Sequence, residues 1–190
     1  KGNHVRRGPF PPPTPEVSVR VLSTDDDPAG DGRSYLKIEP LHAPAVVFET
    51  GDTAPTPASS PVPTPSRFEA TGLQYQFLAL DPERPDLLSA VKEWTANLRV
   101  KHKLTNRGDY WELELLALPK AAGIALRYTT DGSTPTNAGA TTYAGPIRVP
   151  AGTRVVCAVA QASAHNLASS PVTISIPQKG EEARRIDPTK

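Results

Sequence analysis

Residues 124–136 constrain the fold more than any other stretch, because they predict a strand that runs directly into a tight turn. Leu126 and Tyr128 alternate with smaller or polar neighbours, which is the period of a half-buried strand. Asp131 and Gly132 then predict the turn, since glycine accepts a positive φ and an aspartate side chain bonds nearby backbone amides. A proline three residues later has no N–H to donate, so it ends the strand. The role of Asp131 in the turn explains why an aspartate is found here, so no catalytic role needs to be assigned to it.

Similar alternation recurs along the chain and predicts an all-β fold. The predicted strands cover residues 16–22, 35–39, 45–49, 73–80, 98–104, 111–118, 153–160 and 172–176. Proline is frequent, at 22 of 190 residues, and clusters in 9–15 and 55–65, which favours extended connections over helices. Residues 85–96 have partly helical spacing, although the repeat described next favours a strand at 90–95. Long loops are expected at 50–66 and 130–145.

The second half of the chain repeats the first. A backward shift of 80 residues, without a gap between 48 and 80, superimposes strand 153–160 on strand 73–80 and Cys157 on Phe77. The same shift pairs Phe48 with Tyr128, Pro55 with Pro135, Gly72 with Gly152 and Ser89 with Ser169. A period near 80 residues, with several short strands in each unit, is the size of a small β-sandwich.

The expected organisation is therefore two tandem immunoglobulin-like β-sandwiches behind a proline-rich lead-in. The lead-in covers residues 1–15, the first sandwich 16–95 and the second 97–177. A charged tail at 178–190 has no apolar period, and we expect it to be unstructured or held by a partner.

Composition excludes several classes of function. The net charge is +1, so the chain has no overall basic field for nucleic acid or for an anionic membrane. No apolar run approaches the roughly 18–20 residues of a membrane span. With Cys157 as its one cysteine the chain forms no internal disulfide, which favours a reducing compartment, the cytoplasm. A chain that begins at Lys1 and has no methionine is expected to be a piece of a larger protein.

No cofactor or metal is expected. The sequence has no Gly-x-x-x-x-Gly-Lys-Ser/Thr phosphate loop, and its four histidines are scattered rather than set at zinc-ligand spacing. Asp25, Asp26, Asp27 and Asp31 lack the spacing of a calcium-binding helix–loop–helix, so a solvated loop is expected. Cys157 has no basic neighbour in sequence and is predicted to be a buried structural thiol.

The most basic stretch supplies the candidate interaction surface. Arg99, Lys101 and Lys103 fall on one face of a predicted strand because side chains alternate with period two, and Arg107 and Tyr143 complete the set. A nucleic-acid footprint and a solvated strand face both explain these residues. The solvated face is favoured, since no aromatic residues are interleaved.

Aromatic and acidic residues around position 110 allow two interpretations. The aromatic side chains of Trp94, Tyr110, Trp111 and Tyr143 are either a sugar-stacking platform or packing residues, and packing is favoured for the tryptophans. The acids Asp109, Glu112 and Glu114 do not supply the two opposed carboxylates of a glycosidase, because Glu112 and Glu114 share a strand face that points to water. No catalytic residue is expected.

Residues 124–177 resemble the immunoglobulin-like C-terminal domain of chitobiases and β-hexosaminidases. The resemblance rests on residues 128–136 (Tyr-Thr-Thr-Asp-Gly-Ser-Thr-Pro-Thr), Tyr143, the tripeptide 145–147 (Gly-Pro-Ile) and the alternating Val156, Ala158 and Ala160. In those glycosidases the domain is an accessory module, so the resemblance implies a fold and no catalytic residue. The first unit looks like a diverged copy.

A second resemblance concerns the lead-in. Two such units behind the residues 7–13 (Arg-Gly-Pro-Phe-Pro-Pro-Pro) are similar to the C-terminal region of large bacterial P-loop ATPases, some of them in phage-growth-limitation defence systems. This resemblance implies that the chain is the non-ATPase end of such a protein.

Three functions follow as hypotheses. The leading one is a non-catalytic structural or interaction module at the C-terminal end of a larger bacterial protein, a defence-associated ATPase. Its partner is the rest of the parent polypeptide or another protein, met through the loops 54–66 and 137–146. The alternatives are a carbohydrate-associated accessory module of a glycoside hydrolase and a DNA-facing module of a defence ATPase.

Overall fold

A computed structural model describes residues 11–23, 32–136 and 139–178. They form two compact units, of which the first comprises residues 11–22, 35–69 and 74–94 and the second the other described residues. The predictions for most of the lead-in, for Asp25, Asp26, Asp27 and Asp31 and for the tail beyond 178 lie outside the described residues.

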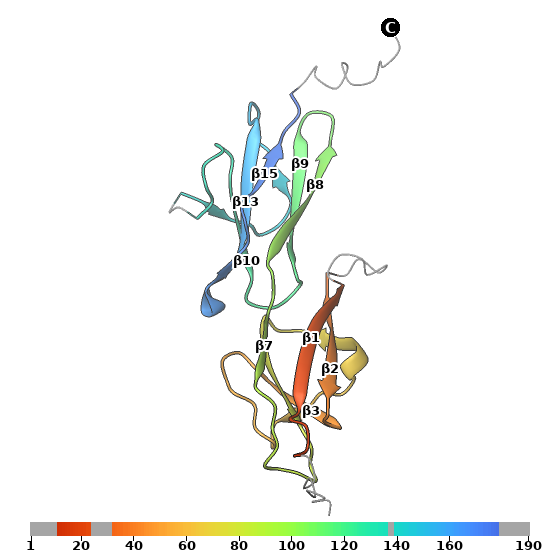
Figure 1. Cartoon of the computed structure of the whole chain (residues 1–190). Coiled ribbons are helices and arrows are strands. Elements are labelled where there is room, and N and C mark those ends of the chain that lie inside the picture. Colours follow the sequence, from red (N-terminus) through yellow and green to blue (C-terminus); the bar gives the residue numbers. More distant parts are fainter. Residues whose placement is uncertain (1–10, 24–31, 137–138, 179–190) are drawn as a thin grey trace, which may run out of the picture. The chain divides into compact units, whose positions relative to one another are not determined.

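The first unit consists of strands and one short 3-10 helix. Its elements are β1 (Glu16–Ser23), β2 (Ser34–Leu41), β3 (Ala45–Thr50), β4 (Ser60–Pro61), η1 (Pro65–Arg67), β5 (Phe68–Ala70), β6 (Gln74–Leu80) and β7 (Lys92–Thr95) (Figure 1). The strand expected at 90–95 is therefore present as β7. The loop expected at 50–66 holds β4 and the start of η1, which are too short to show a period in the sequence.

Aromatic rings join the two sheets of the first unit. The sheets have the strand orders β1-β2-β5 and β4-β3-β6-β7. The ring of Phe68, on β5, lies 5.0 Å from Phe48, 5.2 Å from Tyr75 and 5.6 Å from Phe77, all on the other sheet. Edge-to-face contacts of this kind add to the burial of apolar area. The result is a β-sandwich with an aromatic core.

The second unit has the same kind of architecture. Its elements are β8 (Arg99–Asn106), β9 (Trp111–Leu118), β10 (Ala125–Thr129), β11 (Thr141–Thr142), β12 (Ile147–Arg148), β13 (Val155–Ala162), η2 (Ser163–His165), β14 (Leu167–Ala168) and β15 (Val172–Ser175). One sheet has the order β12-β9-β8 and the other β11-β10-β13-β14, with β15 also paired to β13. Leu113 on β9 and Val156, Ala158 and Ala160 on β13 are buried. The alternating pattern of the sequence predicted both strands.

The two units share their strand order. The sheet β1-β2-β5 corresponds to β8-β9-β12, and β4-β3-β6-β7 corresponds to β11-β10-β13-β15. Two buried serines occupy equivalent places. The Ser89 hydroxyl accepts the Ala79 N–H at 2.9 Å and donates to the next carbonyl, and the Ser169 hydroxyl does the same with Ala160 at 3.0 Å.

Strand pairing corrects the predicted alignment of the two units. Phe48 lies opposite Phe77, whereas Tyr128 lies opposite Ala158. The counterpart of Phe77 is thus Ala158 and not Cys157, so the gapless shift is wrong by one residue across β13. The extra residue lies between β10 and β11, because Phe48 pairs with Ser60 in the first unit whereas Tyr128 pairs with Thr141 in the second. Ladder pairing holds the register of a strand, while a surface loop accepts an insertion.

The turn after β10 forms as its sequence predicts. The Asp131 carboxylate accepts the backbone N–H of Ser133 at 3.0 Å and its hydroxyl at 2.6 Å. Gly132 has a φ of 81°, and Thr129 donates its hydroxyl to the Ser133 carbonyl at 2.6 Å. Pro135 is fully buried beyond the turn. The polar groups of Thr129, Asp131 and Ser133 therefore hydrogen-bond within the turn and stabilise it.

Replacing Gly132 with alanine is expected to destabilise the second unit by about 1–2 kcal/mol, because a left-handed conformation is costly for any residue with a Cβ. Steric crowding does not contribute to this loss, since the nearest atom to a new Cβ is a Val155 side-chain carbon at 4.0 Å. Gly139→Ala is the matched control. Gly139 has no positive φ and nothing within 4 Å, so its replacement is expected to be neutral or slightly stabilising. Urea unfolding of both variants checks this, and equal midpoints would contradict it.

Candidate functional site

Three residues of the predicted basic surface, Arg99, Lys101 and Lys103, lie on β8, and Arg107 follows in the turn after it. Carboxylates of the paired strand β9 neutralise part of this charge. Lys103 is opposite Glu114 in the ladder, and their charged groups are 3.9 Å apart. Arg107 makes two hydrogen bonds with the Glu112 carboxylate, at 2.5 and 3.1 Å, and these raise the pKa of the arginine. The prediction that Glu112 and Glu114 share one face holds, but both carboxylates contact cations.

Tyr143 lies beside this surface. Its hydroxyl accepts the Leu115 backbone N–H at 3.1 Å, and its own N–H donates to the Leu126 carbonyl at 2.8 Å. It lines a shallow hollow of about 330 Å³, the strand hollow, formed by Lys101, His102, Lys103, Glu114, Leu115, Leu116 and Tyr143. The structure therefore brings Lys101, Lys103 and Tyr143 together, whereas Arg99 and Arg107 do not line this hollow.

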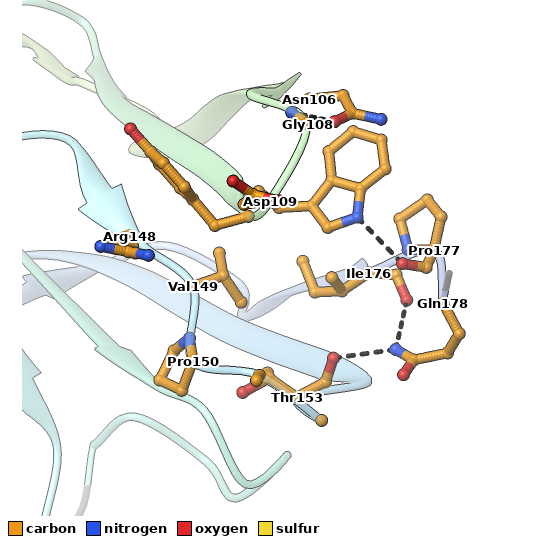
Figure 2. Close-up of a pocket in the computed structure, with 14 residues that line it drawn as sticks. Asn106, Gly108, Asp109, Arg148, Val149, Pro150, Thr153, Ile176, Pro177 and Gln178 are labelled. Carbon is orange, nitrogen blue, oxygen red and sulfur yellow. Dashed lines mark hydrogen bonds between the residues drawn. The ribbon is translucent and has the colours of Figure 1, made fainter. Parts of the chain in front are cut away.

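A second cavity, the turn pocket, opens at one end of the second unit and also has a volume of about 330 Å³. Its walls come from the β8–β9 turn, the segment after β12 and the segment after β15 (Figure 2). The lining residues are Asn106, Gly108, Asp109, Tyr110, Trp111, Arg148, Val149, Pro150, Ala151, Gly152, Thr153, Ile176, Pro177 and Gln178.

Hydrogen bonds hold the three walls in place. In the β8–β9 turn the Gly108 N–H donates to the Asn106 side-chain oxygen at 2.7 Å. The Trp111 indole N–H donates to the Pro177 carbonyl at 3.0 Å, which ties the third wall to the first. The Gln178 amide donates to the Thr153 carbonyl at 3.0 Å and closes the second wall against the third. Hydrogen bonds within the chain therefore tie the three walls of the pocket to one another.

Arg148 brings a cation to this pocket. Its guanidinium carbon lies 4.4 Å from the centre of the Tyr110 ring, a cation–π contact. The sequence allows Tyr110 and Trp111 to be either sugar-stacking or packing residues, and in the structure both line the turn pocket. Arg148 was missed, because it lies on β12 and only folding brings it beside the turn.

The remaining candidates are structural. Trp94 belongs to the first unit, where its ring lies 6.0 Å from Tyr75, as expected for packing. Cys157 is buried, and its thiol lies 3.6 Å from the Gly132 carbonyl, as expected for a structural thiol. Within the described ranges no group of three or more histidine, cysteine, aspartate or glutamate side chains is arranged to hold a metal.

Lowered pKa values mark turns and surface pairs rather than a reactive centre. Hydrogen bonds lower the pKa of Glu39 (chiefly from Lys37), of Asp81 (chiefly from Arg84) and of Asp131 (chiefly from the Ser133 side chain). None of these three carboxyl groups lines the turn pocket or the strand hollow. Over the described part of the chain, no helix has the length and apolar character needed to cross a membrane.

Comparison with known families supports one of the two resemblances. Residues 108–173 match the model of the chitobiase/beta-hexosaminidase C-terminal domain, which agrees with the resemblance seen in the second unit. No match supports the P-loop ATPase resemblance. Neither a curated protein nor a solved structure matches the chain. The second unit is thus similar, over the matched residues, to an accessory domain that is non-catalytic in itself.

Proposed function

We propose that the chain is a non-catalytic accessory module of a larger protein and that it acts by non-covalent contact. The observation that carries the proposal is the match of residues 108–173 to the chitobiase/beta-hexosaminidase C-terminal domain, an accessory domain that is non-catalytic in itself. The acidic residues of the two cavities lie apart, because Asp109 lines the turn pocket and Glu114 lines the strand hollow. Glycoside hydrolysis uses two carboxyl groups about 5–9.5 Å apart across one substrate, so this reaction is the one to test.

An activity assay tests this proposal. The purified chain is expected to release no more product from an aryl N,N′-diacetylchitobioside than the heat-denatured chain does. Release that disappears in Asp109→Asn would contradict the proposal. A second arm uses the full-length gene product with and without residues 11–178. The truncated protein is expected to stay folded but to lose affinity for its substrate or partner, and unchanged affinity would count against an accessory role.

The parent protein is a finer part of the proposal. The name of the matched family favours a glycoside hydrolase, in which this chain serves as a carbohydrate-associated module. The leading hypothesis from the sequence, a bacterial defence ATPase with cytoplasmic location, depends on the lead-in and on the single cysteine. An upstream glycosidase barrel or an upstream phosphate loop in the full-length gene distinguishes the two parents.

DNA contact has weaker support, because Glu114 offsets the charge of Lys103 on β8. We expect duplex binding no tighter than non-specific binding, about 10⁻⁴ M at physiological salt. The double change Lys101→Ala, Lys103→Ala is expected to alter it less than about twofold, whereas Glu114→Gln should strengthen it by removing the offsetting charge. Fluorescence anisotropy at two salt concentrations measures this. Micromolar, salt-dependent binding that the double change abolishes would establish a DNA-facing surface.

A further inference from the structure

Charge pairing sets the turn pocket apart from the rest of the second unit. Four acidic residues lie in the segment 95–178, namely Asp109, Glu112, Glu114 and Asp131. Glu112 contacts Arg107, Glu114 contacts Lys103, and Asp131 bonds Ser133. Asp109 alone makes no hydrogen bond or ion pair with any other residue in the described ranges, and it lines the turn pocket.

The cation of the turn pocket, the Arg148 guanidinium, is also available to a ligand. Among the described residues Arg148 contacts the Tyr110 ring and no carboxylate, so its guanidinium N–H groups have no acidic acceptor. The pocket thus offers an acceptor from one wall and a donor from another. No salt bridge joins the Asp109 carboxylate and the Arg148 guanidinium, so both charged groups are available to a ligand in the pocket.

Opposite charges select the kind of ligand. An anionic ligand is attracted by the Arg148 guanidinium but repelled by the Asp109 carboxylate, and for a cationic ligand the two are reversed, so a ligand with one charge gains from one of the two side chains and loses at the other. A neutral ligand with several hydroxyl groups suits both, because a hydroxyl donates to carboxylate and accepts from guanidinium. Aromatic rings from Tyr110 and Trp111 offer apolar surface for the C–H face of a sugar ring.

We propose that the turn pocket binds a short neutral saccharide, with Asp109 and Arg148 as its hydrogen-bonding residues and Tyr110 and Trp111 as its apolar wall. The volume of about 330 Å³ lies at the lower end of small-molecule pockets and suits about one or two sugar rings. This inference deepens the accessory role proposed above and depends on it. It names the ligand class of a module that does no chemistry itself.

The two tryptophans supply the experiment. Each gives one indole N–H resonance, with Trp111 at the turn pocket and Trp94 in the first unit. Titration with N,N′-diacetylchitobiose or cellobiose is expected to shift the Trp111 resonance in a saturable way and to leave the Trp94 resonance in place. Digalacturonic acid, which is anionic, and chitosan disaccharide, which is cationic, are expected to bind at least about tenfold more weakly.

Matched variants separate the pocket from the rest of the surface. Asp109→Asn and Arg148→Gln are each expected to weaken saccharide binding about tenfold or more, because each removes a charged hydrogen-bonding partner. Glu114→Gln makes the same chemical change as the first variant outside the pocket and is expected to leave the affinity unchanged. The dispersion of the remaining amide resonances in the same spectra tests whether each variant is folded.

Three results would overturn the inference. The first is the absence of any shift of the Trp111 resonance with neutral saccharides at tens of millimolar. The second is a saccharide affinity in Asp109→Asn equal to that of the unsubstituted chain. The third is tighter binding of a charged disaccharide than of a neutral one. A chain that binds no saccharide and hydrolyses none overturns this inference and leaves the accessory role standing. A chain that hydrolyses the aryl chitobioside overturns the accessory role itself.

Discussion

Replacing Phe77 with alanine is expected to lower the free energy of unfolding of the first unit by about 3–5 kcal/mol. The Phe77 side chain has no exposed surface, and its ring lies 5.6 Å from Phe68 and 6.1 Å from Tyr75. Truncation removes the transfer free energy of the ring and leaves a cavity between two sheets that share these aromatic contacts. Close packing limits how far the neighbours can relax into that cavity.

The Trp94 indole resonance, followed in urea, measures this effect, because Trp94 lies beside Tyr75 in the same unit. Val21→Ala is the matched control. Val21 is 50% exposed on β1, so its truncation is expected to change the stability by no more than about 0.5 kcal/mol. Equal losses in the two variants would show that the aromatic cluster does not carry the core of this unit.

The second large effect is expected from Leu113→Ala, at about 2–5 kcal/mol in the second unit. Leu113 has no exposed surface and lies on β9, the central strand of its sheet, opposite Leu104 on one side and Ile147 on the other. Its side chain therefore packs where three strands meet. Removing the isobutyl group leaves a void that neither neighbouring strand can close without losing its register.

Leu116→Ala is the control for this variant, since Leu116 lies on the same strand, faces the other way and is 42% exposed. We expect a loss of no more than about 0.5 kcal/mol there. Urea unfolding followed by the Trp111 indole resonance distinguishes the two. A Leu116 variant as unstable as the Leu113 variant would contradict the assignment of the buried face of β9.

Strands with five or more residues were predictable because their side chains alternate between a buried and an exposed face. The stretch 111–118 was predicted and found with the same bounds, and 16–22 became β1 with one more residue. The two-residue strands β4, β11 and β14 were not predicted, since two residues cannot show a period. The pairs Ser60–Pro61 in β4 and Thr141–Thr142 in β11 also have the polar or proline-containing composition of a loop.

The candidate site was only partly predictable. Asp109, Tyr110 and Trp111 are consecutive, so the sequence itself placed them together. Arg148 and the segment 176–178 join them through strand pairing and through the indole hydrogen bond to Pro177. The expected basic surface is less basic in the structure than its sequence suggests. Lys103 lies opposite Glu114 in the ladder, and Arg107, in the turn after β8, pairs with Glu112 on β9.

By itself the sequence determined the β-sandwich architecture and the turn at residues 131–133, because both depend on local properties: period-two alternation and the φ preference of glycine. Only the tertiary structure decided the one-residue offset between β6 and β13, the charge compensation on β8 and the composition of the turn pocket. Each of these depends on which residues of separate strands face each other. Backbone ladder pairing sets that relation, and no single stretch of the chain encodes it.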